Sequence, residues 1–281
     1  MPLPGHEAEK TPPMRLKIAV VLAHPDDETT MSGTLARYAA QGAEILLICA
    51  TNGAGGASSS TMSPQELGVL RRDEMRSACD VLGIAHLEFL EAPDVVVHLS
   101  KGNYRDVLEE HTDRVAALLT SFLPDILVTF GPDGITGHPT HILVGQVARR
   151  ACRLGVANPV IHQVVYREAQ VHAILGWLAN HPDAWQAYRE EVAKTPNIGA
   201  PTPELFPVPD AVVAATVDVS SYRALRLEAA RQHRSQGGLG YLEAYLAPEI
   251  ECFSVLNQLG EPLVGRCGSE LTVRGRPAAN P

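Results

Sequence analysis

The chain has 281 residues, of which 45% are hydrophobic, and it carries a formal net charge of −9 at pH 7. This length and apolar content suffice for a sizeable core. The acidic balance argues against a nucleic-acid-binding protein, because phosphate contacts need clustered Lys and Arg side chains. No apolar run approaches the roughly 20 residues that span a bilayer, and residues 1–13 lack the apolar core of a signal peptide. We therefore expect a soluble, cytoplasmic protein that binds neither nucleic acid nor a membrane.

Short apolar runs alternate with segments of helical period from residue 16 onward. Residues 16–23 and 44–51 are β-branched and apolar, and residues 30–42 between them have helical spacing and end at a glycine. The alternation continues with strands expected at 86–91, 125–131, 160–168 and 211–220, and helices at 64–83, 104–124, 139–155 and 222–236. This order favours an α/β fold with a mainly parallel sheet that helices cover on both faces.

The expected α/β domain covers residues 16–258. Residues 1–15 are expected to form a disordered N-terminal tail, and residues 259–281 an irregular C-terminal tail. Residues 170–212 interrupt the alternation with both tryptophans of the chain and a Pro-rich stretch. We interpret this segment as an insertion or lid.

Residues 24–28, HPDDE, directly follow the first predicted strand. In an open parallel sheet, ligands bind beyond the carboxyl ends of the strands. His24 and Asp27 are three residues apart, a spacing that lets an imidazole nitrogen and a carboxylate oxygen converge on one ion. Acidic side chains in a first helical turn also occur as simple helix caps, so this stretch alone leaves both interpretations open.

A second pair of residues favours the metal interpretation. His138 and His141 follow the fourth predicted strand in an equivalent loop. Two such loops at one edge of a sheet face each other across a crevice. The sequence therefore predicts a divalent metal site there rather than two unrelated helix caps.

The motifs AHPDDE at 23–28, GHPTH at 137–141 and HRSQ at 233–236 resemble those of the LmbE-like or PIG-L family of zinc-dependent N-deacetylases. The resemblance in motif order extends from about residue 16 to 256. It implies a Rossmann-like fold and one Zn²⁺ per chain, with other divalent ions as alternatives. It also implies hydrolysis of an N-acetyl group, usually on a glucosamine unit of a small sugar conjugate. We further expect a homo-oligomer.

The resemblance assigns roles to individual residues. His24, Asp27 and His141 would bind zinc, and three protein ligands leave an open position for water, as expected of a catalytic site. Asp26 would be the general base, and His138 would stabilise the oxyanion. Many family members carry an aspartate between the two histidines of the second motif, where it can support a charge on the first histidine. This chain has Thr140 there.

Three further residues are candidates for contacts with substrate. By resemblance, Arg71 would contact a sugar or its aglycone and Asp94 a sugar hydroxyl, while Asn52 would line the crevice after the second strand. Ordinary structure offers alternatives: a solvated helix face for Arg71, and turn chemistry for Asp94 and Asn52.

Three classes of function follow from the sequence. The leading one is a zinc-dependent deacetylase acting on an N-acetylglucosamine conjugate. The second keeps the metal but acts on a larger N-acyl or thiol conjugate, or tailors a secondary metabolite. The third is a non-catalytic sugar-binding protein, against which the intact set of candidate catalytic and metal-binding residues argues.

Overall fold

The computed structural model describes residues 15–56, 62–92, 104–155, 158–186, 205–236, 240, 242–256, 267–273 and 276–277. Their main sheet has the strand order β3-β2-β1-β4-β5-β8-β7, and β6 pairs with β5. The strands are β1 (Lys17–Leu22), β2 (Glu44–Cys49), β3 (His86–Phe89), β4 (Ile126–Phe130), β5 (Val160–Arg167), β6 (Pro207–Val208), β7 (Ala215–Asp218) and β8 (Ile250–Val255). The structure confirms the predicted α/β class with a mostly parallel sheet.

The first five of these strands pair in parallel, whereas β8 is antiparallel to both β5 and β7. The centre of the sheet is dry: from Ile18 to Leu22, every side chain of β1 is at most 1% exposed. Continuous apolar runs of this kind are expected where both faces of a sheet are covered. The predicted strand at 211–220 is shorter than expected, because residues 210–212 form a 3-10 turn before β7 begins.

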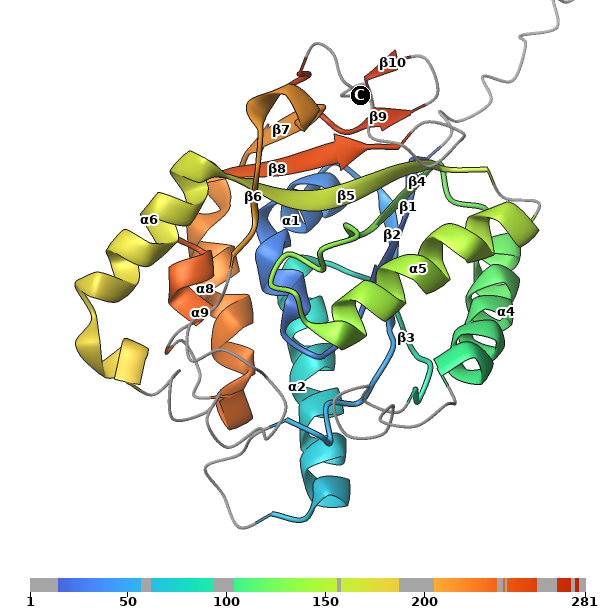
Figure 1. Cartoon of the computed structure of the whole chain (residues 1–281), viewed down its shortest axis with the longest axis horizontal. Helices are drawn as coiled ribbons and strands as arrows, with labels where there is room; N and C mark the ends of the chain where they lie inside the picture. Colours follow the sequence, from blue (N-terminus) through green and yellow to red (C-terminus); the bar gives the residue numbers. More distant parts are fainter. Residues whose placement is uncertain are drawn as a thin grey trace, which may run out of the picture.

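Two groups of helices cover the sheet (Figure 1). Helices α1 (Ser32–Ala40), α2 (Pro64–Leu82) and α8 (Arg223–Gln232) contact one another, and α4 (Tyr104–Phe122) packs on α5 (Pro139–Leu154). Right-handed crossovers place α1 and α2 on one face and α4 and α5 on the other. Helix α6 (Glu168–Ala179) contacts the short α9 (Leu242–Tyr245). In the part of the chain described here, no helix has the length and apolar character needed to cross a membrane.

The predicted insertion at 170–212 contains all but the first two residues of α6 and the two-residue strand β6, which pairs with β5. Its residues 187–204 lie outside the described residues, as does the predicted N-terminal tail up to residue 14. Whether the segment acts as a lid stays a prediction.

Of the predicted C-terminal tail at 259–281, the structure describes residues 267–273 and 276–277. Leu271 is fully buried, Glu270 Oε2 accepts a hydrogen bond of 2.7 Å from the Tyr38 hydroxyl, and Arg37 forms an ion pair with Glu270. Strands β9 (Thr272–Val273) and β10 (Arg276–Pro277) follow as a small antiparallel pair. Glu270 and Leu271 therefore contact α1, whereas the irregular character of 259–281 as a whole stays a prediction.

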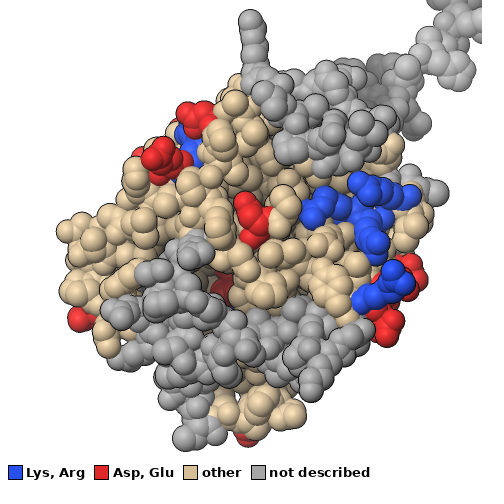
Figure 2. Space-filling model, in the orientation of Figure 1, with Lys and Arg blue, Asp and Glu red and all other residues tan. Residues whose placement is uncertain are grey.

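Basic side chains gather in one place on the face seen in Figure 2, where the C-terminal half of α5 lies. That half contains Arg149, Arg150 and Arg153. Positive charge near a helix C-terminus interacts favourably with the helix dipole. Of the three, Arg153 lies in the last turn, where this interaction acts, while Arg149 donates to the Phe130 carbonyl oxygen at 3.0 Å.

Candidate metal centre

Both histidine motifs follow neighbouring parallel strands. β1 ends at Leu22, two residues before His24, and β4 ends at Phe130, ahead of the loop that leads into α5. β1 pairs with β2 on one side and with β4 on the other, so the chain runs from β1 toward one edge of the sheet and later returns to add β4 on the opposite side of β1. The motifs therefore meet at the point where the strand order reverses, which is the usual ligand site of an open α/β sheet.

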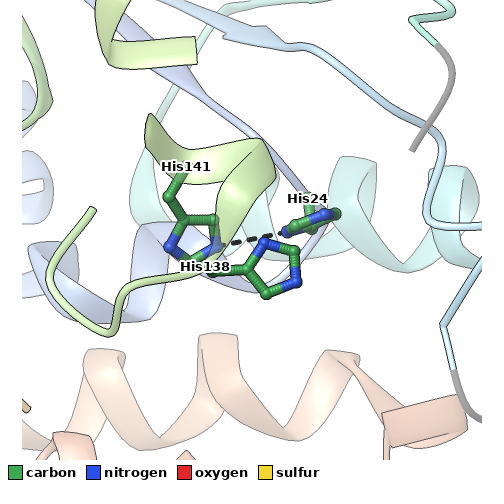
Figure 3. A group of neighbouring side chains, drawn as sticks. All are labelled: His24, His138 and His141. Carbon is green, nitrogen blue, oxygen red and sulfur yellow. Dashed lines mark hydrogen bonds between the residues drawn. The ribbon is translucent and has the colours of Figure 1, made fainter. Parts of the chain in front are cut away.

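The side chains of His24, His138 and His141 converge there (Figure 3). One ring nitrogen from each lies within 4.8 Å of the others. His24 Nδ1 and His141 Nε2 lie 3.3 Å apart. The sequence predicted that these three histidines meet at one edge of the sheet; the assignment of His24 and His141, but not His138, to a metal stays a prediction.

Asp27 completes a second, tighter group with His24 and His141. Asp27 Oδ1 lies 3.2 Å from His141 Nε2, and Asp27 Oδ2 lies 3.7 Å from His24 Nδ1. Four-coordinate zinc, with bonds of about 2.0–2.2 Å, places neighbouring ligand atoms about 3.3–3.6 Å apart. The distances of 3.2 and 3.3 Å from His141 Nε2 to Asp27 Oδ1 and to His24 Nδ1 are close to this range, and two imidazoles with one carboxylate are ligands that zinc accepts.

Hydrogen bonds orient His141 and fix its tautomer. Its Nδ1 lies 3.0 Å from the Gly134 carbonyl oxygen, which can only accept, so Nδ1 carries the proton. Its ring stacks on Phe130 at a centroid distance of 4.3 Å. With Nδ1 protonated, Nε2 faces Asp27 Oδ1, and either a proton or a bound cation can lie between these two atoms. Metal-binding histidines are commonly held in this way by a backbone carbonyl.

Asp27 is held as a carboxylate by its surroundings. Burial alone would raise its pKa, but the charge and hydrogen bond of His141, together with His24, hold the pKa of Asp27 well below its usual range. Its Oδ2 accepts backbone N–H groups from Ala23 and His24 at 3.0 and 2.7 Å. These bonds occupy Oδ2 and leave Oδ1 facing His141.

His138 differs from the other two histidines because it caps a helix. It is the N-cap residue of α5, and its Nδ1 accepts the backbone N–H of Thr140 at 3.2 Å. An imidazole that accepts at Nδ1 carries its proton on Nε2. In this conformation His138 is therefore a neutral ring with one N–H to donate, not the imidazolium that a flanking aspartate would favour.

Asp26 has a strained backbone and a paired carboxylate. Its φ of 111° lies in the left-handed region, where a residue with a Cβ costs about 1–3 kcal/mol. Its Oδ2 accepts a hydrogen bond of 3.2 Å from Arg71. Burial, opposed by the Arg71 guanidinium, raises the pKa of Asp26 to about 6. A carboxyl group with such a pKa is suited to exchange protons near neutral pH.

Arg71 lies inside the protein rather than on a solvated helix face. It is 3% exposed, and its guanidinium donates to the Pro25 and Gly53 carbonyl oxygens at 2.5 and 3.1 Å as well as to Asp26. A Cβ at Gly56 would lie 2.2 Å from Arg71 Nη1, so the glycine makes room for the guanidinium. The predicted sugar contact of Arg71 stays untested. The observed contacts join the two loops that follow β1 and β2.

The other two predicted substrate contacts, of Asn52 and Asp94, stay predictions. The Asn52 side chain is half-buried, and its Oδ1 accepts the Ala54 N–H at 3.0 Å, as in an ordinary turn. Asp94 lies outside the described residues.

Sequence reasoning missed several buried polar partners behind the site. Glu28 lies 2.6 Å from His233 of the HRSQ motif, and Glu74 accepts two hydrogen bonds from Ser235. Burial opposes protonation of His233, but the Glu28 carboxylate raises the pKa of His233 above its ordinary value. The HRSQ motif at 233–236 was the available signal in the sequence, because four consecutive residues with hydrogen-bonding side chains stand at the end of a predicted helix and need polar partners when they are buried.

Comparisons with known proteins agree with the motifs. The family model described as PIG-L, GlcNAc-PI de-N-acetylase, matches residues 19–152. The 1D-myo-inositol 2-acetamido-2-deoxy-alpha-D-glucopyranoside deacetylase of Actinosynnema mirum is 30% identical over 240 residues, which cover 78% of this chain and 80% of that relative.

Two solved structures show the same fold. The N,N'-diacetylchitobiose deacetylase of Pyrococcus horikoshii has a TM-score of 0.57 at 20% identity, over 86% of this chain and 84% of that one. The 4-carboxy-2-hydroxymuconate hydratase of Pseudomonas putida has a TM-score of 0.59 at 15% identity, over 92% and 100% of the two chains. A fold shared by a deacetylase and a hydratase does not define the reaction. The sequence match over most of both chains does define the family: this chain belongs to the PIG-L family.

Proposed function

We propose that this protein is a zinc-dependent N-deacetylase that hydrolyses the acetamide group of an N-acetylglucosamine-type sugar conjugate. The observation that carries the proposal is the convergence of His24, Asp27 and His141, with Asp26 directly beside them. The relative from Actinosynnema mirum, which is named for deacetylation of a glucosamine linked to inositol, supports the substrate class.

In this proposal His24, Asp27 and His141 would hold the metal. Zinc bound by three protein ligands supplies Lewis acidity, which lowers the pKa of a water molecule to about 7 and polarises an amide carbonyl. His138 is left out of the ligand set because its Nδ1 already accepts the Thr140 N–H.

Asp26 takes the proton of the attacking water. Its carboxylate is oriented by Arg71, and its pKa of about 6 lets it accept a proton at neutral pH and give it up again. The same proton is then available for the leaving amine, which must be protonated before the C–N bond breaks.

His138 stabilises the oxyanion through its Nε2–H. The Thr140 N–H at Nδ1 fixes this tautomer. A neutral donor aimed at a developing oxyanion contributes to catalysis because it is already oriented before charge develops.

The proposal is tested by a panel of substrates with zinc restored after chelation. The panel holds N-acetylglucosaminyl-inositol, N,N'-diacetylchitobiose, a thiol conjugate and a glucosamine with a longer N-acyl chain. Acetate release from the first two supports the proposal. Turnover of only the long-chain or thiol conjugate would instead identify the alternative amidase, and binding without turnover would identify a sugar-binding protein.

A cytoplasmic location, a homo-oligomeric state and the absence of nucleic-acid and membrane partners belong to the same proposal. They rest on the acidic composition and on the family resemblance. Sedimentation of the purified protein measures the oligomeric state directly.

A further inference from the structure

A buried acid-histidine pair lies behind the metal-binding loop and has no part in the chemistry described above. Glu28 and His233 are both 0% exposed, and Glu28 Oε1 lies 2.6 Å from His233 Nε2. Burying a carboxylate is costly unless it is paired and hydrogen-bonded. His233 directly follows α8, so the pair joins the loop after β1 to a distant part of the chain.

The second oxygen of Glu28 contacts the proposed base. Glu28 Oε2 accepts the backbone N–H of Asp26 at 3.1 Å. Asp26 has a left-handed backbone conformation, with φ 111° and ψ −18°, and this N–H is its own main-chain amide. Such a conformation persists only where surrounding contacts determine it. Arg71 holds the carboxylate of Asp26, whereas Glu28 holds its main chain.

We propose that Glu28 and His233 are positioning residues, which hold the main chain of Asp26 in its left-handed conformation and thereby aim its carboxylate at the reacting water. Glu28 makes the contact to Asp26, and His233 fixes Glu28 from the opposite side. The inference rests on the proposed function of Asp26 as general base.

A neighbouring pair provides a matched structural control. Glu74 of α2 accepts the N–H and hydroxyl of Ser235 at 2.8 and 2.6 Å, two residues beyond His233. Glu74 is also buried, at 6% exposure. Both acids therefore form hydrogen bonds with the HRSQ segment. The hydrogen bonds of Glu74 go to Ser235, whereas Glu28 also accepts one from the main chain of Asp26.

The test is a double-mutant cycle in the zinc-loaded full-length protein. Glu28→Ala and Asp26→Asn are made singly and together, with Glu74→Ala as the control and N-acetylglucosaminyl-inositol as the substrate. We expect Glu28→Ala to keep zinc and KM but to lower kcat about 10–100-fold, the loss expected from a displaced catalytic group. In the Asp26→Asn background, Glu28→Ala should lower kcat by less than about threefold. The effects of two mutations are not additive when one residue acts through the other. Glu74→Ala should lower the melting temperature with little effect on kcat.

A conservative variant guards against a failure to fold. Glu28→Gln keeps an oxygen for the Asp26 N–H, and it should restore most of the kcat that Glu28→Ala loses. An equal loss of kcat from Glu28→Ala in both backgrounds would overturn the positioning role. So would a crystal structure of Glu28→Ala in which the φ of Asp26 is unchanged, a readout that does not depend on activity. Full activity of Asp26→Asn would instead refute the proposed base itself.

Discussion

His24 Nδ1 lies 3.3 Å from His141 Nε2, although 117 residues separate the two histidines in the chain. The contact follows from the sheet, because β1 and β4 are parallel neighbours and each histidine lies in the loop after its strand. Asp27 lies against both rings. The ligand set proposed for the metal is thus assembled from two loops, each of which supplies part of it.

The first prediction separates this ligand set from the cluster of three histidines. Asp27→Ala and His141→Ala should each reduce bound zinc well below one ion per chain, because each removes one of three protein ligands. His138→Ala should retain zinc, since its Nδ1 is engaged by the Thr140 N–H. Zinc per chain is measured by elemental analysis after dialysis. Loss of zinc from His138→Ala with retention in Asp27→Ala would show that the three histidines form the site instead.

The sequence predicted those features of the site that depend on residues close together in the chain. The strands before both motifs have continuous apolar runs, and the spacing within each motif places its side chains on one turn. The partners of those side chains were not predictable, because they depend on how distant segments pack. Arg71 shows the difference: its charge suggested solvent or substrate, yet Gly53 and Gly56 leave space for its guanidinium beneath the loop.

The antiparallel part of the sheet shows the same limit of prediction from sequence. Strand β8 was not predicted, although its burial is as complete as that of β1 beyond its first residue. Its six residues include Glu251, an acid that a local pattern assigns to the surface. In the structure Glu251 accepts the N–H groups of Gly33 and Thr34 at the start of α1 and lies 3.5 Å from Arg226.

The second prediction concerns the stability that this buried ion pair contributes. Arg226 and Glu251 have side chains only 1% and 3% exposed. Glu251→Ala should reduce the free energy of unfolding by about 3–5 kcal/mol, because it leaves the guanidinium buried without its carboxylate. The control is Glu228→Ala, which breaks the exposed pair with Arg231 and should cost no more than about 1 kcal/mol. Equal midpoints of urea unfolding for the two variants would contradict the interpretation.

The third prediction is a dependence of stability on pH. His162 is fully buried in β5, and burial lowers its pKa from the ordinary value of 6.5 to about 4. The folded state therefore keeps the ring neutral while the unfolded state binds a proton below pH 6.5. Stability from this group is fully present above pH 6.5 and is lost as the pH falls toward 4, by about 3 kcal/mol in total.

Urea unfolding at several pH values measures this effect. The variant His162→Gln removes the titrating ring and should flatten the dependence of stability on pH between 4 and 6.5. An unaltered slope in His162→Gln would assign the pH dependence to other groups.

The central claim is that Asp26, beside a zinc ion held by His24, Asp27 and His141, activates water for deacetylation. The most direct measurement is the initial rate of acetate release from N-acetylglucosaminyl-inositol by zinc-loaded protein and by its Asp26→Asn variant, with the zinc content of both determined. We predict equal zinc in the two proteins and a rate at least about 100-fold lower in the variant, as is typical for loss of a general base. Equal rates at equal zinc content would contradict the claim.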